Sequence, residues 1–332
     1  MRIGSNPQKQ ERKISMTTHH RVVVVVYIPN EVGFYKDSFD VFKLCIDSLV
    51  STLNSKALLT IVNNGSHKKV ADFLNGYLEE KKIDTLITHN TNIGKIDALI
   101  GAARGAREKY ITLADSDILF VKGWQEKVEE VFTVFPNVGS VSPIPVRIGL
   151  LAGTSSVLKY ILLGKIKCMF IPIPENYLGY NRYLDSINWG FEDKDDKKWS
   201  VVEKNGLKAV IGSGHQVLTI DRDILFTTTP SNPSLTLVGN LSEQDYVDVP
   251  IDKAGKLRLS TYHNYAFHMG NKLENWMVEE QELNAKTLDT IEDFGKIVKP
   301  SPDLFNSKIK DKWYGLKKMI LKKIFSLFII KN

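Results

Sequence analysis

Cysteine is scarce in this sequence, which has only Cys45 and Cys168 among its 332 residues. Both lie inside apolar stretches, so no disulfide framework is implied and a reducing cytoplasm is the expected compartment. A chain of this length can bury a large core without cross-links. Long apolar runs are scarce too. The run Val22–Val26 is far shorter than the ~20 residues that span a bilayer, and it predicts a buried strand.

Positive charge is not spread along the chain. The net charge is +6, but seven lysines fall between Lys308 and Lys323 against one acid, Asp311. We therefore expect no nucleic-acid partner, and no motif that reads RNA or DNA is present. Residues 1–20 are polar and basic without an apolar core, so we expect no signal peptide and interpret them as a disordered leader, with Met16 as an alternative start.

Apolar runs and helical spacing alternate regularly through the first half of the chain. The pattern predicts strands at 21–28, 58–62, 85–88 and 110–114, with helices at 39–53, 70–78 and 94–109 between them. This order predicts an α/β fold, in which a mostly parallel, Rossmann-like sheet is flanked by helices. Ligands bind beyond the carboxyl ends of such strands, where Asn63 and Asp115 lie.

The middle of the chain is less regular. It predicts strands at 138–141, 209–220 and 257–269 and the start of a helix at 242–254. Residues 175–198 are rich in aromatic and charged side chains and predict a long surface excursion. Its side chains are candidates for contacts with a second substrate, namely Tyr183, Trp189, Glu192 and Asp193, together with Trp199 just beyond it.

The triplet Asp115-Ser116-Asp117 directly follows a predicted strand. Two carboxylates at this spacing can converge on one hard cation, the first of them through a water or a ribose. Mn²⁺ and Mg²⁺ prefer oxygen ligands and bridge diphosphate oxygens, where they neutralise the charge on a departing diphosphate. By itself the triplet is a weak signal, because solvated surface turns contain the same pattern by chance.

Several motifs around the triplet occur in a fixed order. They are an entry strand at 22–29, a turn at Val62–Ser66, the N-x-G motif of Asn90–Lys95, a small-residue segment at 98–106, and the strand that ends in the D-x-D triplet. Together they resemble the family 2 glycosyltransferases of the GT-A fold, as found in bacterial cell-surface glycan synthesis. The resemblance covers residues 21–124 well and the remainder more loosely.

The resemblance implies how a nucleotide-sugar donor is bound. The loop of Ile28 and Pro29 would line the base, and Asn63 takes the place of an acid that commonly contacts uracil or ribose. We expect a UDP-linked donor, although this departure leaves the base identity open. Further donor contacts are implied for Asn92, Gly94, Lys95, Asp115 and Ser116, and metal binding for Asp115 and Asp117. An ordinary helix cap is the alternative for residues 92–94.

The segment Ser242-Glu243-Gln244-Asp245 lies at the start of a predicted helix. In the family, an acidic pair at such a position holds the catalytic base, which accepts a proton from the acceptor hydroxyl in an inverting transfer. Here Gln244 separates the two acids. We favour Asp245 over Glu243, and the alternative is that both acids only stabilise a helix N-terminus.

His268 ends the last predicted strand, just before Gly270. Several GT-A enzymes supply a late histidine as a metal ligand, which implies this role for His268 and favours Mn²⁺. The competing candidate is His263, and a purely structural histidine is the alternative. We interpret the remaining notable histidines, His19, His20 and His215, as incidental.

The C-terminal segment predicts an amphipathic helix. One side carries Ile309, Trp313, Leu316, Ile320, Ile324 and Leu327, and the other carries Lys308, Lys312, Lys318, Lys322 and Lys323, while Lys310 and Lys317 break the pattern. Such a helix suits a surface-lying anchor on an anionic membrane. Packing on its own domain or on a partner subunit is the alternative, and an oligomer is compatible with it. The expected domain limits are 21–290 for the enzyme domain and 291–332 for the extension.

These observations together predict an inverting, metal-dependent hexosyltransferase on the inner face of the plasma membrane. It would move a sugar from a nucleoside-diphosphate sugar to a glycan or lipid-linked acceptor in cell-surface polysaccharide synthesis. A sugar-phosphate nucleotidyltransferase is the nearest alternative, but its Gly-rich phosphate loop is missing from Tyr27–Glu31. The other alternative is a non-catalytic scaffold that binds nucleotide-sugars at the membrane.

Overall fold

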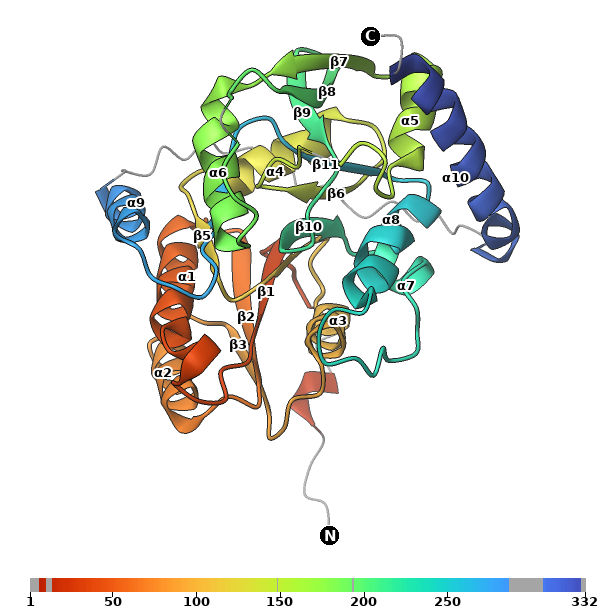
Figure 1. The fold of residues 1–332 in the computed structure, drawn as a ribbon. Coiled ribbons are helices and arrows are strands. Elements are labelled where there is room, and N and C mark those ends of the chain that lie inside the picture. The colour runs from red at the N-terminus through yellow and green to blue at the C-terminus, as the bar shows by residue number, and fades with distance from the viewer. Residues whose placement is uncertain (1–5, 10–13, 148, 193, 287–306, 330–332) are drawn as a thin grey trace.

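The computed structural model describes residues 6–9, 14–147, 149–192, 194–286 and 307–329. Parts of the expected leader (1–5 and 10–13) and of the expected extension (287–306 and 330–332) therefore lie outside the described residues. A ten-stranded sheet runs through the centre in the order β3-β2-β1-β4-β10-β6-β11-β9-β8-β7, and β5 and β12 form a separate pair (Figure 1). Its strands are β1 (His20–Val26), β2 (Ala57–Asn64), β3 (Thr85–His89), β4 (Tyr110–Ala114), β6 (Val138–Ser142), β7 (Lys167–Pro172), β8 (Lys198–Lys204), β9 (Leu207–Ile211), β10 (Val217–Asp221) and β11 (Leu257–Thr261).

Most strands of the large sheet point the same way. Strands β3, β2, β1 and β4 pair in parallel, as predicted. Because β10 is antiparallel to both of its neighbours, β4 and β6, the latter two share one direction. Following the remaining pairings, seven of the ten strands run in that direction and β10, β9 and β7 run against it. The predicted α/β class with a mostly parallel sheet is confirmed.

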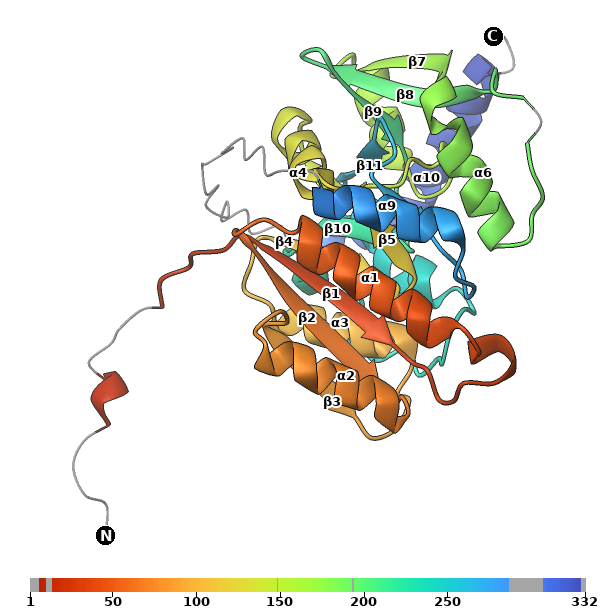
Figure 2. The ribbon, with the colours of Figure 1, turned by 90° about the vertical axis from the view of Figure 1, so that its left-hand side faces the viewer.

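Helices cover both faces of the sheet (Figures 1 and 2). They are α1 (Ser38–Thr52), α2 (Lys68–Glu79), α3 (Lys95–Gly105), α4 (Trp124–Val134), α5 (Ser155–Leu162), α6 (Tyr177–Ser186), α7 (Ile224–Thr227), the π-helix η4 (Gln244–Asp248), α8 (Val249–Lys253), α9 (Asn275–Lys286) and α10 (Ser307–Ile329). Strand β1 shows why two layers form, because Val22, Val24 and Val26 pack toward α1 and α2, whereas Val23 and Val25 pack toward α3.

Two ion-pair clusters hold the amino end of β1, opposite the end that carries the D-x-D triplet. Arg21 donates to both carboxylate oxygens of the buried Glu108, at 2.9 and 3.0 Å. His19 and His20 contact Glu129 at 2.8 and 2.7 Å. Burial favours the neutral form of Glu129, but the hydrogen bonds to the two histidines lower its pKa well below the ordinary value. His19 and His20, which we interpreted as incidental to the chemistry, have a structural role, because they fix strand β1 to α4.

Two segments predicted as single strands are each divided. Residues 209–220 contain the end of β9 and most of β10, separated by a turn in which Gly212 has a φ of +105°. Residues 257–269 contain β11 and the short strand β12 (Ala266–His268), which leaves the large sheet and pairs with β5 (Ile118–Phe120). In this pairing His268 stands opposite Ile118, directly after the D-x-D triplet.

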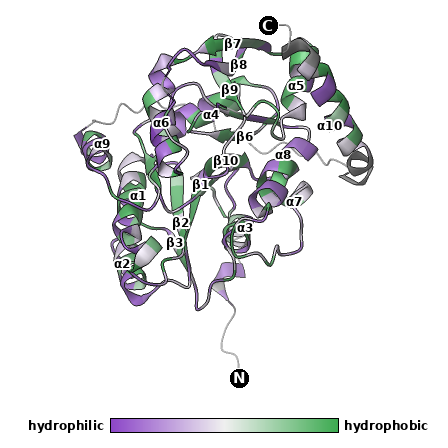
Figure 3. Cartoon of the chain, viewed as in Figure 1, coloured by the Kyte–Doolittle hydropathy of each residue, from purple (hydrophilic) through white to green (hydrophobic). Residues whose placement is uncertain are grey.

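Helix α10 lies beside α5 (Figure 1). It is joined to the domain by the Tyr314 hydroxyl, which donates to the buried Asp252 at 2.9 Å. Several of its apolar side chains are nevertheless exposed, namely Trp313, Leu316, Met319, Ile320 and Ile324. Figure 3 shows polar and apolar residues together along this helix. No helix in the described part of the chain is both long and apolar enough to cross a membrane.

Candidate active site

The candidate site lies at the carboxyl ends of β1, β2 and β4, as the sheet order requires. Lys95, the first residue of α3, lies 2.7 and 2.9 Å from the two carboxylate oxygens of Asp115 and 3.5 Å from Oε1 of Glu243. Burial alone would lower the pKa of Lys95, but the charge and hydrogen bond of Asp115, together with the charges of Glu243 and Asp117, outweigh it, so the pKa is raised. The ammonium group therefore stays charged and holds Asp115 and Glu243 near each other.

Asp117 meets His268 on the other side of the triplet. His268 Nε2 lies 3.4 Å from Asp117 Oδ2, and His268 Nδ1 is 2.7 Å from the hydroxyl of Ser186. The main-chain N–H of Met269 donates to the carbonyl oxygen of Asp117 at 2.8 Å, which fixes this approach. Oδ1 of Asp117 is buried without a hydrogen-bond partner among the described residues. Burial raises the pKa of Asp117, an effect that His268 opposes and Asp115 reinforces.

The N-x-G loop is fixed by side chains of the neighbouring strand. Asn92 Oδ1 accepts from the N–H of Gly94 at 2.8 Å and from Asn64 Nδ2 at 2.9 Å. Asn64, which the motif did not point to, also accepts from the N–H of Ile93. Gly94 has a φ of +96°, and a Cβ there would collide with the carbonyl oxygen of Thr236. This explains the glycine: its backbone lies directly against the 230s loop.

The loop after β1 is held in a similar way. The N–H of Ile28 donates to the Ser66 hydroxyl, and the N–H of Ser66 donates to Oδ1 of Asn63, both at 3.0 Å. Ile28 and Asn63 are buried, and Pro29 is partly exposed. Asn63 therefore uses its amide oxygen to shape the loop. Ser116 lies partly exposed between the two aspartates.

The two acids at the start of η4 have different surroundings. Glu243 is only 9% exposed, accepts a hydrogen bond from the Ser242 hydroxyl and faces Lys95. Burial favours its neutral form, but hydrogen bonding to its own main-chain N–H and the charge of Lys95 lower the pKa of Glu243. Asp245 is exposed and makes no described contact with Lys95 or Asp115. Of the two, the structure brings only Glu243 to the triplet.

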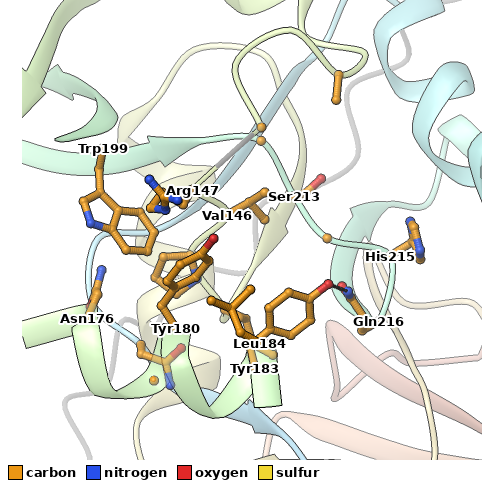
Figure 4. Close-up of a pocket in the computed structure, with 18 of the residues that line it drawn as sticks. Val146, Arg147, Asn176, Tyr180, Tyr183, Leu184, Trp199, Ser213, His215 and Gln216 are labelled. Carbon is orange, nitrogen blue, oxygen red and sulfur yellow. Dashed lines mark hydrogen bonds between the residues drawn. The ribbon is translucent and has the colours of Figure 1, made fainter. Parts of the chain in front are cut away.

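A cavity of about 250 Å³ is lined by residues of α6 and of the loop between β9 and β10 (Figure 4). Aromatic and apolar side chains line most of it, including Tyr180, Tyr183, Leu184, Trp189, Trp199 and Val146. It borders the site directly, since Gln216 Nε2 donates to the Tyr183 hydroxyl at 2.9 Å and the Tyr183 ring stacks edge-on against His268. Of the expected contacts for a second substrate, Tyr183, Trp189 and Trp199 line this cavity. Glu192 pairs with Arg147 at its edge, and Asp193 lies outside the described residues.

Two polar atoms at the cavity have no hydrogen-bond partner among the described residues. They are Nε of Arg147, a donor, and Oδ1 of Asn176, an acceptor. A buried polar atom without a partner is costly, so a ligand that both donates and accepts would fit here. Hydroxyl groups do both, and flat aromatic side chains suit the apolar faces of sugar rings.

His215 also lines the cavity, although the sequence led us to interpret it as incidental. Its Nδ1 lies 3.5 Å from Oδ2 of Asp248, and Asp248 Oδ1 accepts from Arg258 Nη2 at 2.6 Å. These residues come from three distant segments, so no local motif could have revealed them. The one available signal was the Gly212-Ser213-Gly214 turn directly before His215, which is typical of a loop held close to a neighbouring backbone.

Residues 24–181 match the model of the family described as Glycosyl transferase family 2. A search of curated proteins returned no match. The chain is similar to the solved structure of mannosyltransferase PcManGT from Pyrobaculum calidifontis with GDP-Man and Mn²⁺, at 15% identity over 74% of this chain and 55% of that one, with a TM-score of 0.40. It is also similar to the solved structure of S. aureus TarS 1-349, at 10% identity over 75% of this chain and 60% of that one, with a TM-score of 0.44. A third similar structure is GalNAc-T7 with UDP, GalNAc and Mn²⁺, at 12% identity over 75% of this chain and 42% of that one, with a TM-score of 0.44. The chain therefore spans less than two thirds of the length of each of these three proteins.

Proposed function

Because residues 24–181 carry a glycosyl transferase family 2 domain, we propose that this glycosyltransferase is an inverting, metal-dependent enzyme that uses a nucleoside-diphosphate sugar. The observation that carries the proposal is the convergence of Lys95, Asp115 and Asp117 at the carboxyl end of β4. Charged groups of both signs at this edge suit a metal-bound diphosphate. The hexosyl subtype and a UDP-linked donor are parts of the same proposal.

A divalent metal fits the donor set at the triplet. In the described part of the chain no three His, Cys, Asp or Glu side chains are grouped to hold an ion by themselves. The buried, unpartnered Oδ1 of Asp117 is the atom that a cation would satisfy, and Asp115 and His268 are the other ligands we propose. Carboxylates with an imidazole suit Mn²⁺, and Mg²⁺ is the alternative. When bound, the metal would neutralise charge on the leaving diphosphate.

Lys95, Asn92 and Gly94 would hold the donor beside this metal. The Lys95 ammonium carries the positive charge that diphosphate oxygens require, and Gly94 lets the backbone before it pack against the 230s loop. Ile28, Pro29 and Asn63 lie at the adjoining strand ends, where the base would stack. A bound diphosphate would compete with Asp115 and Glu243 for Lys95.

The acceptor would enter through the aromatic cavity. Its aromatic side chains and its unpartnered Arg147 and Asn176 atoms suit a sugar hydroxyl acceptor, which supports a glycan or lipid-linked saccharide. The catalytic base, which accepts the proton of the acceptor hydroxyl, would be an ionisable group between this cavity and the triplet. Of the two acids, Glu243 faces the triplet and Asp245 is exposed.

Helix α10 supports a location at a membrane surface. Its exposed apolar side chains stand together with Lys318, Lys322 and Lys323, which suits an anionic bilayer surface. We propose a peripheral position on the inner face of the plasma membrane and a role in cell-surface polysaccharide synthesis. Residues 307–312 and 327–329 belong to the same predicted amphipathic helix, but their side chains are not described by the structure.

A donor screen tests the proposal. Thermal unfolding would be followed with UDP-, GDP-, dTDP- and CDP-sugars, each with and without MnCl₂, and turnover measured as release of the nucleoside diphosphate. We expect one nucleotide class to stabilise the protein only when the metal is present. If no nucleotide sugar shifts the transition or is turned over with Mn²⁺ or Mg²⁺, the proposed function is wrong.

A further inference from the structure

His215 lines the aromatic cavity (Figure 4), and the charges of Lys95 and Asp115 in the donor site act on it. The loop that carries it, between β9 and β10, is tied down on both sides. The main-chain N–H of Asp115 donates to the carbonyl oxygen of Gln216 at 2.8 Å. Arg258 Nη2 donates to the carbonyl oxygen of Ser213 at 2.7 Å. The backbone of His215 is therefore held beside the strand end that carries the triplet.

The imidazole ring is oriented by a carboxylate that is itself fixed. Nδ1 of His215 lies 3.5 Å from Asp248 Oδ2, and Arg258, whose side chain is only 3% exposed, holds the other oxygen of Asp248. Nε2 has no hydrogen-bond partner among the described residues, and the side chain is 44% exposed. A neutral histidine with its proton on Nδ1, toward a carboxylate, presents Nε2 as a proton acceptor.

Charged groups on several elements act on the pKa of His215. The hydrogen bond to Asp248 raises the pKa of His215, and burial opposes it. Lys95, from the start of α3, acts to lower the pKa, and Asp115, from the end of β4, acts to raise it. Glu243 faces the same space from the start of η4. A general base is most effective when its pKa lies near the working pH, and histidine starts closest to that value.

The acids nearby are less suited to the same task. Glu243 has a lowered pKa and pairs with Lys95, which makes it a weak base. Asp245 is exposed and does not line the cavity. Asp248 lines the cavity, but Arg258 and His215 occupy its two oxygens. Among the described lining residues, His215 is the group that combines access to the cavity, an oriented ring and an Nε2 that can accept a proton.

We propose that His215 is the general base of the transfer and that Asp248 positions it, an inference that rests on the proposed function. The acceptor oxygen attacks the anomeric carbon of the donor as its proton passes to His215 Nε2. The bond from the anomeric carbon to the diphosphate oxygen breaks, and its electron pair leaves with the nucleoside diphosphate. Protonated His215 is stabilised by Asp248 and returns its proton to solvent.

The test uses the full chain and the donor selected by the screen, with water as the acceptor. His215→Ala should lower kcat by about 10²–10⁴-fold, the usual contribution of a general base, with little change in donor KM. The acid limb of the pH profile should disappear, and added imidazole should restore part of the rate. His263→Ala is the matched control, because His263 is exposed and outside the cavity, and it should keep the wild-type profile.

Asp248→Asn provides an independent measurement. It removes the carboxylate that raises the pKa of His215, so the acid limb should move to lower pH while some activity remains. A His215→Ala enzyme with near-normal kcat and an unchanged acid limb would overturn the inference and leave the proposed function standing. Loss of that limb in Glu243→Gln or Asp245→Asn instead would also overturn it. An inactive wild type in the donor screen would refute both.

Discussion

Replacing Asp117 with Asn should change the stability of the protein in opposite directions with and without metal. The Asp117 side chain is 28% exposed, but its Oδ1 is buried with no hydrogen-bond partner among the described residues, and burial raises the pKa of Asp117. An amide of the same shape removes the buried charge. Relief of one unsatisfied buried group is worth about 1–3 kcal/mol. Without metal, Asp117→Asn should therefore be more stable than the wild type at pH 7.

Metal reverses the order. If Mn²⁺ binds the wild type at 100 times its Kd, it adds about 2.7 kcal/mol to the free energy of unfolding. At roughly 2–4 °C per kcal/mol, this raises the wild-type Tm by about 5–10 °C. Asp117→Asn lacks the charge that binds the cation, so its Tm should not move, and its metal-dependent donor turnover should be lost.

The assay is thermal unfolding in EDTA and in MnCl₂, with Asp223→Asn as the control for loss of an exposed carboxylate. The pKa of Asp117 is higher in the folded protein than its unfolded value of 3.8. The ionised carboxyl therefore lowers the free energy of unfolding at pH values above the folded pKa, and this effect is absent below pH 3.8. The metal-free advantage of Asp117→Asn should therefore shrink as the pH falls toward 3.8. An Asp117→Asn variant that is less stable in EDTA, or that gains as much from Mn²⁺ as the wild type, would refute the reasoning.

Three further predictions concern other parts of the molecule. Gly94→Ala should abolish donor turnover, because a φ of +96° costs an L-residue about 1–2 kcal/mol and the new Cβ would collide with Thr236. Gly101→Ala is the control and should leave turnover intact, because a Cβ at Gly101 meets open space. Equal activity of the two variants would contradict this prediction. Glu129→Gln should lower the free energy of unfolding by about 1.5–3 kcal/mol at pH 7. In urea titrations this difference should vanish as the pH falls below 4.5 and through the lowered pKa that Glu129 has in the folded protein. A difference that does not depend on pH would count against the ion pair. Replacing Lys318, Lys322 and Lys323 with glutamate should weaken binding to vesicles of 30% phosphatidylserine by at least about 100-fold, because each lysine contributes ~1 kcal/mol. Binding is measured by sedimentation with the vesicles, and unchanged sedimentation of the variant would refute the membrane proposal.

Local pattern accounts for much of the fold. The valine run of β1 predicts a strand buried on both faces, because neighbouring side chains point to opposite sides, and the structure packs Val22 and Val23 into different layers. The breaks at 209–220 and 257–269 were missed, although the first segment contains Gly212-Ser213-Gly214 and the second contains the polar stretch 260–264. Only pairing partners decide where such a segment leaves the sheet, and β12 leaves it to pair with β5.

By itself, the sequence determined the strand end at which Asp115 and Asp117 stand, and the N-x-G motif that precedes α3. These features depend on residues close together in the chain. Tertiary structure alone decided that Glu243 faces Lys95, that Asp245 does not, and that His215 meets Asp248 at the cavity. Such contacts join segments far apart in the chain, so they depend on how β4, β10 and η4 pack and not on any local spacing.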